Sequence, residues 1–527
     1  MLKSFRRRLQ DGLLAVEGLF DYPFGPKWNP MRQLGTLSFF FYWVVAVSGI
    51  YVFVFFDTTV KGAYESVEYM TVQQWYAAGV MRSLHRYASD AMVVTTVFHL
   101  LREFITDRYR GVRWFTWFTG VPILWFLYIS GVSGYWLVWD ELAQYVAIAS
   151  MEWLDWLGIF GEPIANNFLK PGSLSDRFFT LLFFMHIFAP LFLLFIMWIH
   201  LLKLNRPKVN PPRGLAFGCL VALIALSLAY PAVSHAPADL AKTPAVLSLD
   251  WFYMFAYPIY DEWGAGATWG VAFGASLLVA FMPWLPPLKH GEPAEVIPEK
   301  CNGCTRCFED CPFAAISMQP RDDGRPFERI AVVDPRYCTG CGMCVGSCPV
   351  STPFRRTGEL VTGIELPDLR LHALRAATDT AIEQAKETGI AGTGDGEPAV
   401  LVVGCDHGCE IDELVGPGVS TVKVPCVGML PPSFIDYAFS RGKADGVLLH
   451  GCREGDCYHR LGIDWTQERM DGMRDPYLRE RVARERIRTC WISHNEGGRL
   501  RRELDAFRDD LIQLPTPESG DPKTRLA

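Results

Sequence analysis

The sequence predicts a multi-domain chain with three structured parts: a six-helix transmembrane bundle, a small cysteine-rich α+β module, and an α/β domain with a short parallel sheet. Three observations predict this order. Long apolar stretches fill the first 286 residues, every cysteine except Cys219 follows residue 300, and apolar strands alternate with helical stretches after residue 398. A length of 527 residues is also too great for one core.

The composition favours a chain that is partly embedded in a membrane and partly soluble. Hydrophobic residues make up 50% and charged residues 20%, which is too apolar for an ordinary soluble protein and too charged for one that lies wholly in a membrane. The net charge of −7 gives no reason to expect nucleic-acid binding. The basic amino terminus lacks the compact apolar core of a cleaved signal peptide.

We expect residues 1–34 to form an amphipathic surface segment and residues 35–286 to form the bundle. Basic residues precede the first apolar stretch and lie between the second and third and between the fourth and fifth, so these places are predicted to be cytoplasmic. An even number of crossings leaves the later domains in the cytoplasm of a prokaryote, where reducing conditions favour metal thiolates. Each stretch has the roughly 20 residues needed to cross a bilayer core; they lie near 35–56, 80–104, 115–138, 178–202, 214–233 and 268–286.

Four histidines form two matched pairs on the second and fourth apolar stretches. His85 and His99 are 14 residues apart, and so are His186 and His200, which places each pair on one helix face with roughly 21 Å of rise between its members. Because both helices cross in the same direction, His85 is predicted at the depth of His186 and His99 at the depth of His200. Two bis-imidazole sites suit two haems. Helix-packing histidines, or zinc at each pair, are the alternatives.

Glycines repeat the same spacing on the first and third stretches. Gly35 and Gly49 are 14 residues apart, and so are Gly120 and Gly134. A missing side chain lets a bulky group approach the backbone, which favours haem-facing positions. Small residues also help membrane helices to pack, and this remains the alternative explanation.

Residues 30–286 resemble cytochrome b of the quinol-oxidising bc complexes. The resemblance rests on the paired spacings, on Arg82-x-x-His85, on Gly134-Tyr135 before Trp139, and on Asp176-Arg177-Phe178 at the fourth stretch. It implies two b-type haems whose ligands are the histidine pairs given above. Arg82 and the four glycines would lie beside these haems. It also implies a homodimer like that of the bc complexes. No CxxCH sequence occurs, so no attached c-type haem is indicated.

The same resemblance points to a quinone site near the haem of His85 and His186, which we call the outer haem; the haem of His99 and His200 is the inner one. After Thr243-Pro244 the chain reads Leu249-Asp250-Trp251-Phe252, where the family has Pro-Glu-Trp-Tyr. Asp250 then takes the place of the acid that accepts a proton from quinol, and Asp250 and Trp251 are the predicted catalytic residues. The substitutions leave two alternatives open: an altered or silent pocket, and an ordinary solvated acid on a surface loop.

After a linker at 287–298, residues 299–350 carry two cysteine runs with the spacing of a bacterial two-cluster ferredoxin. In this spacing the fourth cysteine of each run ligates the other cluster. We therefore predict two [4Fe–4S] clusters, and a zinc site is the alternative. The first cluster takes Cys301, Cys304, Cys307 and Cys348, and the second takes Cys311, Cys338, Cys341 and Cys344.

A helical linker at 351–397 is expected to precede the α/β domain at 398–505 and a polar tail at 506–527. Ligands collect at the carboxyl ends of strands in open α/β sheets, and cysteines follow three of the predicted strands. These thiols indicate an iron–sulfur site, with a redox dithiol or free core cysteines as alternatives. The predicted ligands are Cys405, Cys409, Cys426, Cys452 and Cys457.

Residues 398–500 resemble the delta subunit of methyl-viologen-reducing hydrogenase. The resemblance rests on Pro425-Cys426-Val427-Gly428 and on the segment 446–459, which contains Gly-Cys-x-x-Gly-Asp-Cys. It implies a [2Fe–2S] cluster and electron transfer to heterodisulfide-reductase-type flavoproteins. The first cysteines, Cys405 and Cys409, have three residues between them where the family has two, so the sequence leaves open which four of the five thiols bind iron.

Taken together, these features predict a membrane-bound oxidoreductase subunit that works within a larger complex. It links quinone, through two haems, two [4Fe–4S] clusters and a [2Fe–2S] cluster, to a cytoplasmic flavoprotein. One alternative is a haem-containing membrane anchor with a non-functional quinone pocket, and another is a thiol-dependent zinc or redox-sensing protein. The direction of electron flow is not encoded in the sequence.

Overall fold

A computed structural model describes residues 2–169, 174–243, 246–285, 291–351, 360, 362–387, 397–440 and 442–514. The predicted tail beyond residue 514, Pro244, and parts of both predicted linkers lie outside the described residues. The chain divides into two compact units. The first comprises residues 1–202 and 207–288, and the second comprises residues 203–206 and 289–527.

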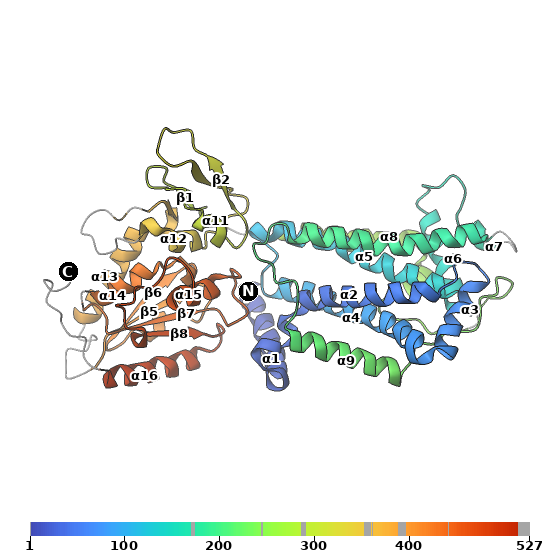
Figure 1. The fold of residues 1–527 in the computed structure, drawn as a ribbon, viewed down its shortest axis with the longest axis horizontal. Helices are drawn as coiled ribbons and strands as arrows, with labels where there is room; N and C mark the ends of the chain where they lie inside the picture. The colour runs from blue at the N-terminus through green and yellow to red at the C-terminus, as the bar shows by residue number, and fades with distance from the viewer. Residues whose placement is uncertain are drawn as a thin grey trace. The chain divides into compact units, whose positions relative to one another are not determined.

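The first unit is helical. Helices α2 (Leu34–Phe55) and α4 (Val80–Ile105) pack along each other, as do α5 (Trp114–Val138) and α8 (Asp176–Leu201) (Figure 1). Helix α9 (Arg213–Ala229) packs on α4, and α10 (Tyr257–Phe281) packs on α5. Shorter helices, α3 (Gly62–Glu68), α6 (Glu141–Asp155) and α7 (Asn166–Leu169), occupy the connections. This pairing brings the histidine helices and the glycine helices together.

Each of the six predicted spans overlaps one of these helices, but only four helices of the described residues are long and apolar enough by themselves to cross a membrane. These four include α2 and α8 and the segments 111–138 and 257–284. Helix α9 has 17 residues and is short for a span. Helix α4 is long enough, but it carries five charged residues: Arg82, Arg86, Asp90, Arg102 and Glu103.

Helix α1 (Leu2–Trp28) covers the sequence predicted to lie at the membrane surface, and buried charges tie it to the bundle. Glu17 is fully buried, and its Oε1 accepts a hydrogen bond of 2.9 Å from Nε of Arg102 on α4. Asn29 caps the following turn and donates to the Glu17 carbonyl oxygen at 2.7 Å. A buried carboxylate is stable only when it is paired in this way.

The second unit begins with a small module around two short helices, α11 (Arg306–Asp310) and α12 (Met343–Ser347). Strands β2 (Ile316–Pro320) and β3 (Arg329–Val333) form an antiparallel pair, and β1 (Glu295–Val296) pairs with β4 (Ile364–Glu365). Each helix follows a residue in the left-handed conformation, Thr305 or Gly342, within a cysteine run. The two halves of the module therefore repeat one local design.

The last part of the second unit is a parallel four-stranded sheet with the order β6-β5-β7-β8 (Figure 1). Its strands are β5 (Val400–Cys405), β6 (Val419–Val424), β7 (Gly446–Gly451) and β8 (Ile487–Trp491), and each overlaps a predicted strand. All six positions of β5 and of β7 are buried, as expected for strands covered on both faces.

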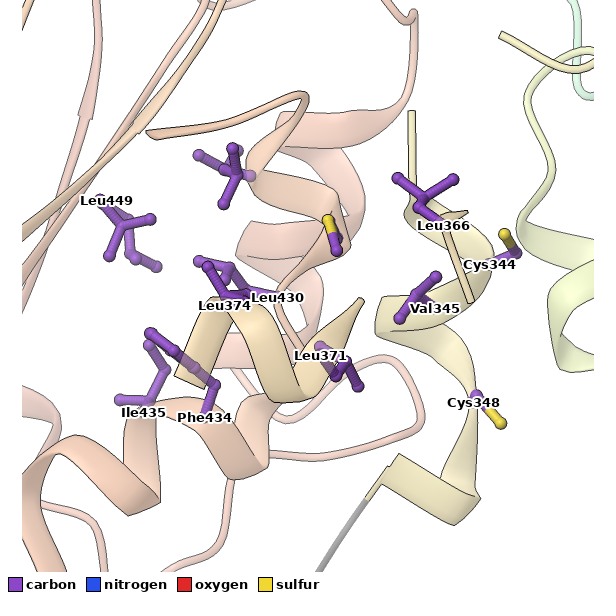
Figure 2. Close-up of a cluster of buried hydrophobic side chains, with 14 of the residues drawn as sticks. Cys344, Val345, Cys348, Leu366, Leu371, Leu374, Leu430, Phe434, Ile435 and Leu449 are labelled. Carbon is purple, nitrogen blue, oxygen red and sulfur yellow. The ribbon is translucent and has the colours of Figure 1, made fainter. Parts of the chain in front are cut away.

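Alternate side chains of β5 face two different helical layers. Val400 and Val402 belong to a core with α16 (Gly497–Gln513), whereas Leu401 and Val403 belong to a core with α13 (Leu371–Glu387) and α14 (Pro432–Ser440). A fourth helix, α15 (Gly462–Met470), follows Cys457. Figure 2 shows this second core, in which Leu371 of α13 lies near Val345 of α12. The cysteine module and the sheet thus share one apolar core.

Candidate functional site

Each of the four predicted glycines lies directly against one of the four histidines. A side-chain carbon added at Gly49 would lie 2.8 Å from Cε1 of His85, and one added at Gly134 would lie 3.1 Å from Cε1 of His186. The corresponding distances to Cε1 of the partner imidazole are 3.3 Å at Gly35, which faces His99, and 3.7 Å at Gly120, which faces His200. The repeated spacing of 14 residues therefore matches glycine to histidine on neighbouring helices.

Backbone carbonyls one turn before the glycines orient the imidazole rings. Nδ1 of His85 lies 2.9 Å from the Val45 carbonyl oxygen, and Nδ1 of His186 lies 3.1 Å from that of Ser130. Val45 and Ser130 each stand four residues before the glycine that contacts the same ring. A protonated Nδ1 that donates to a carbonyl leaves Nε2 unprotonated, which is the form that binds iron.

The outer imidazoles face each other across a cavity. The ring centroids of His85 and His186 are 6.2 Å apart, and both rings line a cavity of about 590 Å³ together with Gly49 and Gly134. Arg82 also lines it, donating to Ser234 at 2.8 Å and facing Glu68 at 3.6 Å. The vacant glycine faces, the oriented rings and the cationic side chain fit a bis-imidazole haem with anionic substituents.

The inner imidazoles are held differently. Nδ1 of His200 lies 3.1 Å from the Thr119 hydroxyl, and the ring contacts the Thr116 carbonyl in the same register as at the outer site. Gly35 is the second residue of α2, so no helical carbonyl stands four residues before it. The Glu103 carboxylate lies 4.0 Å from Nδ1 of His99.

Asp250 lines the outer cavity, but both of its carboxylate oxygens are already occupied. Oδ1 accepts a hydrogen bond of 2.7 Å from the Phe252 amide. Oδ2 accepts from Arg86 at 2.8 Å and from the Tyr135 hydroxyl at 2.5 Å. Arg86 also pairs with Asp90 one turn along α4, so one guanidinium joins two carboxylates beside the cavity.

Trp251 stands apart from this network. Its side chain is 80% exposed, and it is not among the residues that line the cavity. Asp250 and Trp251 are the catalytic residues that the sequence predicts. Arg86 and Asp90 stood out in the sequence only as ionisable residues of the second apolar stretch, and Tyr135 only as part of the resemblance, so none of them was predicted at the quinone site. The available signal was the presence of ionisable residues in a membrane helix, which are costly and mark function.

The eight cysteines of the small module form two groups that follow the crossed pattern. Burial and the nearby thiols of Cys304, Cys348 and Cys301 raise the pKa of Cys307 to about 12. Burial also raises the pKa of Cys341 to about 12, and its thiol neighbours are Cys311 and Cys338. Such thiols stay protonated at neutral pH unless iron binds them, because metal binding displaces the proton.

Four of the five C-terminal candidate thiols form a closed ring. Cys405 and Cys457 each adjoin both Cys426 and Cys452, and interaction with these two thiols lowers the pKa of Cys405 and Cys457 well below the usual thiol value. Cys405 is the last residue of β5, Cys426 follows β6 and Cys452 follows β7, so the ring lies at the carboxyl edge of the sheet.

Cys409 lies outside this ring. Its thiol donates to the Ser493 carbonyl oxygen at 2.9 Å, and its side chain packs in the α16 core with Cys490, on the other face of the sheet from Cys405. Among the described residues, no three His, Cys, Asp or Glu side chains converge on one point as the ligands of a single ion do.

Three regions of the chain match known families, in the order that the sequence resemblances predict. Residues 19–207 match Cytochrome b/b6/petB, residues 300–352 match the 4Fe-4S dicluster domain, and residues 410–515 match Methyl-viologen-reducing hydrogenase, delta subunit. A solved structure titled "Hyperthermophilic respiratory Complex III" is 19% identical, with a TM-score of 0.40; the match covers 48% of this chain and 75% of that chain.

The three matches together support an integral membrane protein with an electron-transfer, oxidoreductase role. Cytochrome b implies haem b, and the dicluster family implies iron–sulfur clusters. Residues 410–515 are similar to a family that is described as a hydrogenase subunit.

Proposed function

We propose that this chain carries electrons between quinone in the membrane and a cytoplasmic redox protein. The observation that carries the proposal is the matched register of glycine and histidine, in which each imidazole lies against a glycine of the neighbouring helix. His85 and His186 hold the outer haem b, and His99 and His200 hold the inner one. Haem supplies one-electron chemistry when bound, and the protein orients its ligands and excludes water.

Six helices, α2, α4, α5, α8, α9 and α10, cross the membrane in this proposal. Helix α4 is stable there because its charged side chains pair within the bundle: Arg86 with Asp90 and Asp250, Arg102 with Glu17, and Arg82 with Glu68. The positive-inside rule then places the iron–sulfur domains in the cytoplasm of a prokaryotic cell.

Quinol is oxidised, or quinone reduced, beside the outer imidazoles. Quinol oxidation releases two protons and two electrons. Asp250, one of the carboxylates that line the cavity, receives one proton, the other proton passes to water, and the two electrons leave one at a time by way of the haem sites. For this step Asp250 must loosen its contact with Arg86 or Tyr135, because both of its oxygens already accept hydrogen bonds. Arg86 keeps the carboxylate in place between turnovers.

The cytoplasmic domains carry the electrons onward. The two crossed cysteine sets hold two [4Fe–4S] clusters, and the ring of Cys405, Cys426, Cys452 and Cys457 holds a [2Fe–2S] cluster. Its delta-subunit-like surroundings suggest a heterodisulfide-reductase-like flavoprotein as the partner. Quinone reduction is the downhill direction for electrons from low-potential clusters, and the opposite direction needs membrane potential or bifurcation.

Quinol-dependent reduction of the purified protein tests this function. We expect reduced-minus-oxidised bands of haem b to develop when a quinol is added, and His186→Ala to lose the outer haem while His200→Ala loses the inner one. Absence of haem absorbance from the purified protein would contradict the whole proposal.

The engaged oxygens of Asp250 favour a second candidate, a haem-containing anchor whose quinone pocket is silent. In that case the haems would be present and chemically reducible, but quinol would not reduce them and quinone-site inhibitors would have no effect. The same measurement therefore separates the two functions.

A further inference from the structure

The two crossed cysteine sets differ in their surroundings. In the first set Cys304 is exposed and Cys301 is half-buried, whereas in the second set only Cys338 is partly exposed. One ligand of the second set also packs in a small apolar cluster with a thiol of the C-terminal ring. The members of this cluster are Cys341, Met343, Cys426, Leu461 and Trp465.

Met343 fills the space between these two thiols. It is fully buried, and it lies between Cys341 and Cys344 in the chain. A side-chain carbon added at Gly428 would lie 2.7 Å from Cγ of Met343. One added at Gly462 would lie 4.0 Å from Cε of Met343 and would overlap the Cys426 sulfur. Both glycines are therefore needed for the cysteine module and the thiol ring to approach this closely.

A buried ion pair fixes the same contact. Asp310 precedes Cys311, a ligand of the second set, and its side chain is 3% exposed. Arg469 of α15 is fully buried, pairs with Asp310 and donates to the Gly428 carbonyl oxygen at 3.0 Å, two residues after Cys426. One guanidinium thus joins the ligand segment of one site to that of the other.

Two further contacts hold this ion pair in place. Arg474 donates to the second Asp310 oxygen at 2.7 Å, and its guanidinium carbon lies 3.4 Å from the centroid of the Trp465 ring. The Trp465 indole donates to the Asp310 carbonyl oxygen at 3.2 Å. A buried charge pair contributes geometric definition rather than bulk stability, which suits a positioning role.

We infer that the cluster of Cys311, Cys338, Cys341 and Cys344 is the direct electron partner of the C-terminal thiol ring, and that Asp310 and Arg469 position the two against each other. The inference rests on the proposed function. One electron passes from the reduced centre to the oxidised one, with no bond made or broken. Because electron transfer weakens steeply with separation, a packed contact between two sites favours it, and Cys341, Met343 and Cys426 provide such a contact.

Electron paramagnetic resonance of the full-length, dithionite-reduced protein tests the pairing. Two reduced centres that lie close together split or broaden each other's signals. We expect the signal of the C-terminal centre to be broadened, to stay broadened in Cys304→Ala, and to sharpen in Cys341→Ala. The opposite pattern, or an unbroadened signal in the unmodified protein, would overturn the inference. The iron content of Cys341→Ala will show whether this variant loses both [4Fe–4S] clusters. If it does, Cys304→Ala alone tests the pairing: a signal that stays broadened supports it, and one that sharpens contradicts it.

The positioning role has its own matched pair of variants. Asp310→Asn removes the buried charge, whereas Asp334→Asn removes a partly exposed carboxylate of the same module that pairs only locally with Arg336. We expect weaker broadening in Asp310→Asn at unchanged iron content, and no change in Asp334→Asn. Arg469→Lys keeps the charge but loses the fork that spans Asp310 and Gly428, so it should also weaken the broadening.

Unchanged broadening in Asp310→Asn and Arg469→Lys, with all iron retained, would overturn the positioning role. If Asp310→Asn fails to fold, Arg469→Lys decides alone. Failure of the proposed function looks different: a protein without iron and sulfide has no such centres at all, and haem that does not respond to quinol leaves the cluster pairing unaffected.

Discussion

The outer and inner histidine pairs share one helical register but differ in what surrounds them. Carbonyls of α2 and α5 anchor both outer rings, and the cavity beside them carries the network of Arg86, Asp90 and Asp250. At the inner pair, His99 of α4 lies against Gly35 at the start of α2 and faces Glu103. Two ligand pairs with the same spacing can therefore have different electrostatic surroundings when one of them lies at a helix end.

The largest expected effect comes from the different distances between glycine and histidine at the two sites. Gly49→Ala would place a methyl group 2.8 Å from His85, whereas Gly120→Ala would place one at an ordinary contact distance of 3.7 Å from His200. We expect Gly49→Ala to lose the outer haem and Gly120→Ala to keep both. The haem-to-protein ratio measures this, and equal loss in the two variants would contradict the difference between the sites.

The second effect concerns the acid that only the outer site has. Asp250→Asn should lower quinol-dependent haem reduction by about 10²–10⁴-fold, the usual contribution of a positioned proton acceptor. Asp239→Asn is the control, because this exposed acid pairs with Lys242 and does not line the cavity. Stopped-flow absorbance at the haem bands gives the rates. Equal rates in the unmodified protein and Asp250→Asn would favour the silent pocket.

The third effect belongs to the inner site alone. A carboxylate near a ligating imidazole raises the basicity of the ring and favours oxidised iron. Glu103→Gln should therefore raise the midpoint potential of the inner haem, by about 60 mV if the equilibrium constant of this one-electron couple changes about tenfold. Redox titration followed by absorbance resolves the two haems, and a shift in the outer haem instead would reverse the assignment.

The smallest effects should be alike at the two sites. The Ser133 hydroxyl lies 3.2 Å from Nδ1 of His186, and the Thr119 hydroxyl lies 3.1 Å from Nδ1 of His200. Ser133→Ala and Thr119→Val each remove one hydroxyl contact while a backbone acceptor remains, so each should cost about 0.5–1.5 kcal/mol. Chemical denaturation of the haem-loaded protein measures the loss in the free energy of unfolding for each variant. A large loss in only one of the two variants would contradict the expected likeness of the two sites.

In the C-terminal domain, the sequence was enough to predict the strands but not the set of ligands. The strands were predictable because apolar runs bounded by Gly, Pro and Asp are typical of buried parallel strands. The ligand set was not, because Cys405 and Cys409 both lie close to the end of β5 in the sequence. Only the turn that sends Cys409 toward Ser493 and the α16 core separates them, and that turn depends on packing across the sheet.

The sequence by itself determined the periodic features of this protein: the histidines and glycines 14 residues apart, the crossed cysteine spacing and the order of the three family matches. Such features are local, because helical rise and loop length convert spacing directly into position. Tertiary structure decided the exposure of Trp251, the network around Asp250, and the contact of Cys341 with Cys426 through Met343. These depend on which distant segments pack together, which no spacing along the chain encodes.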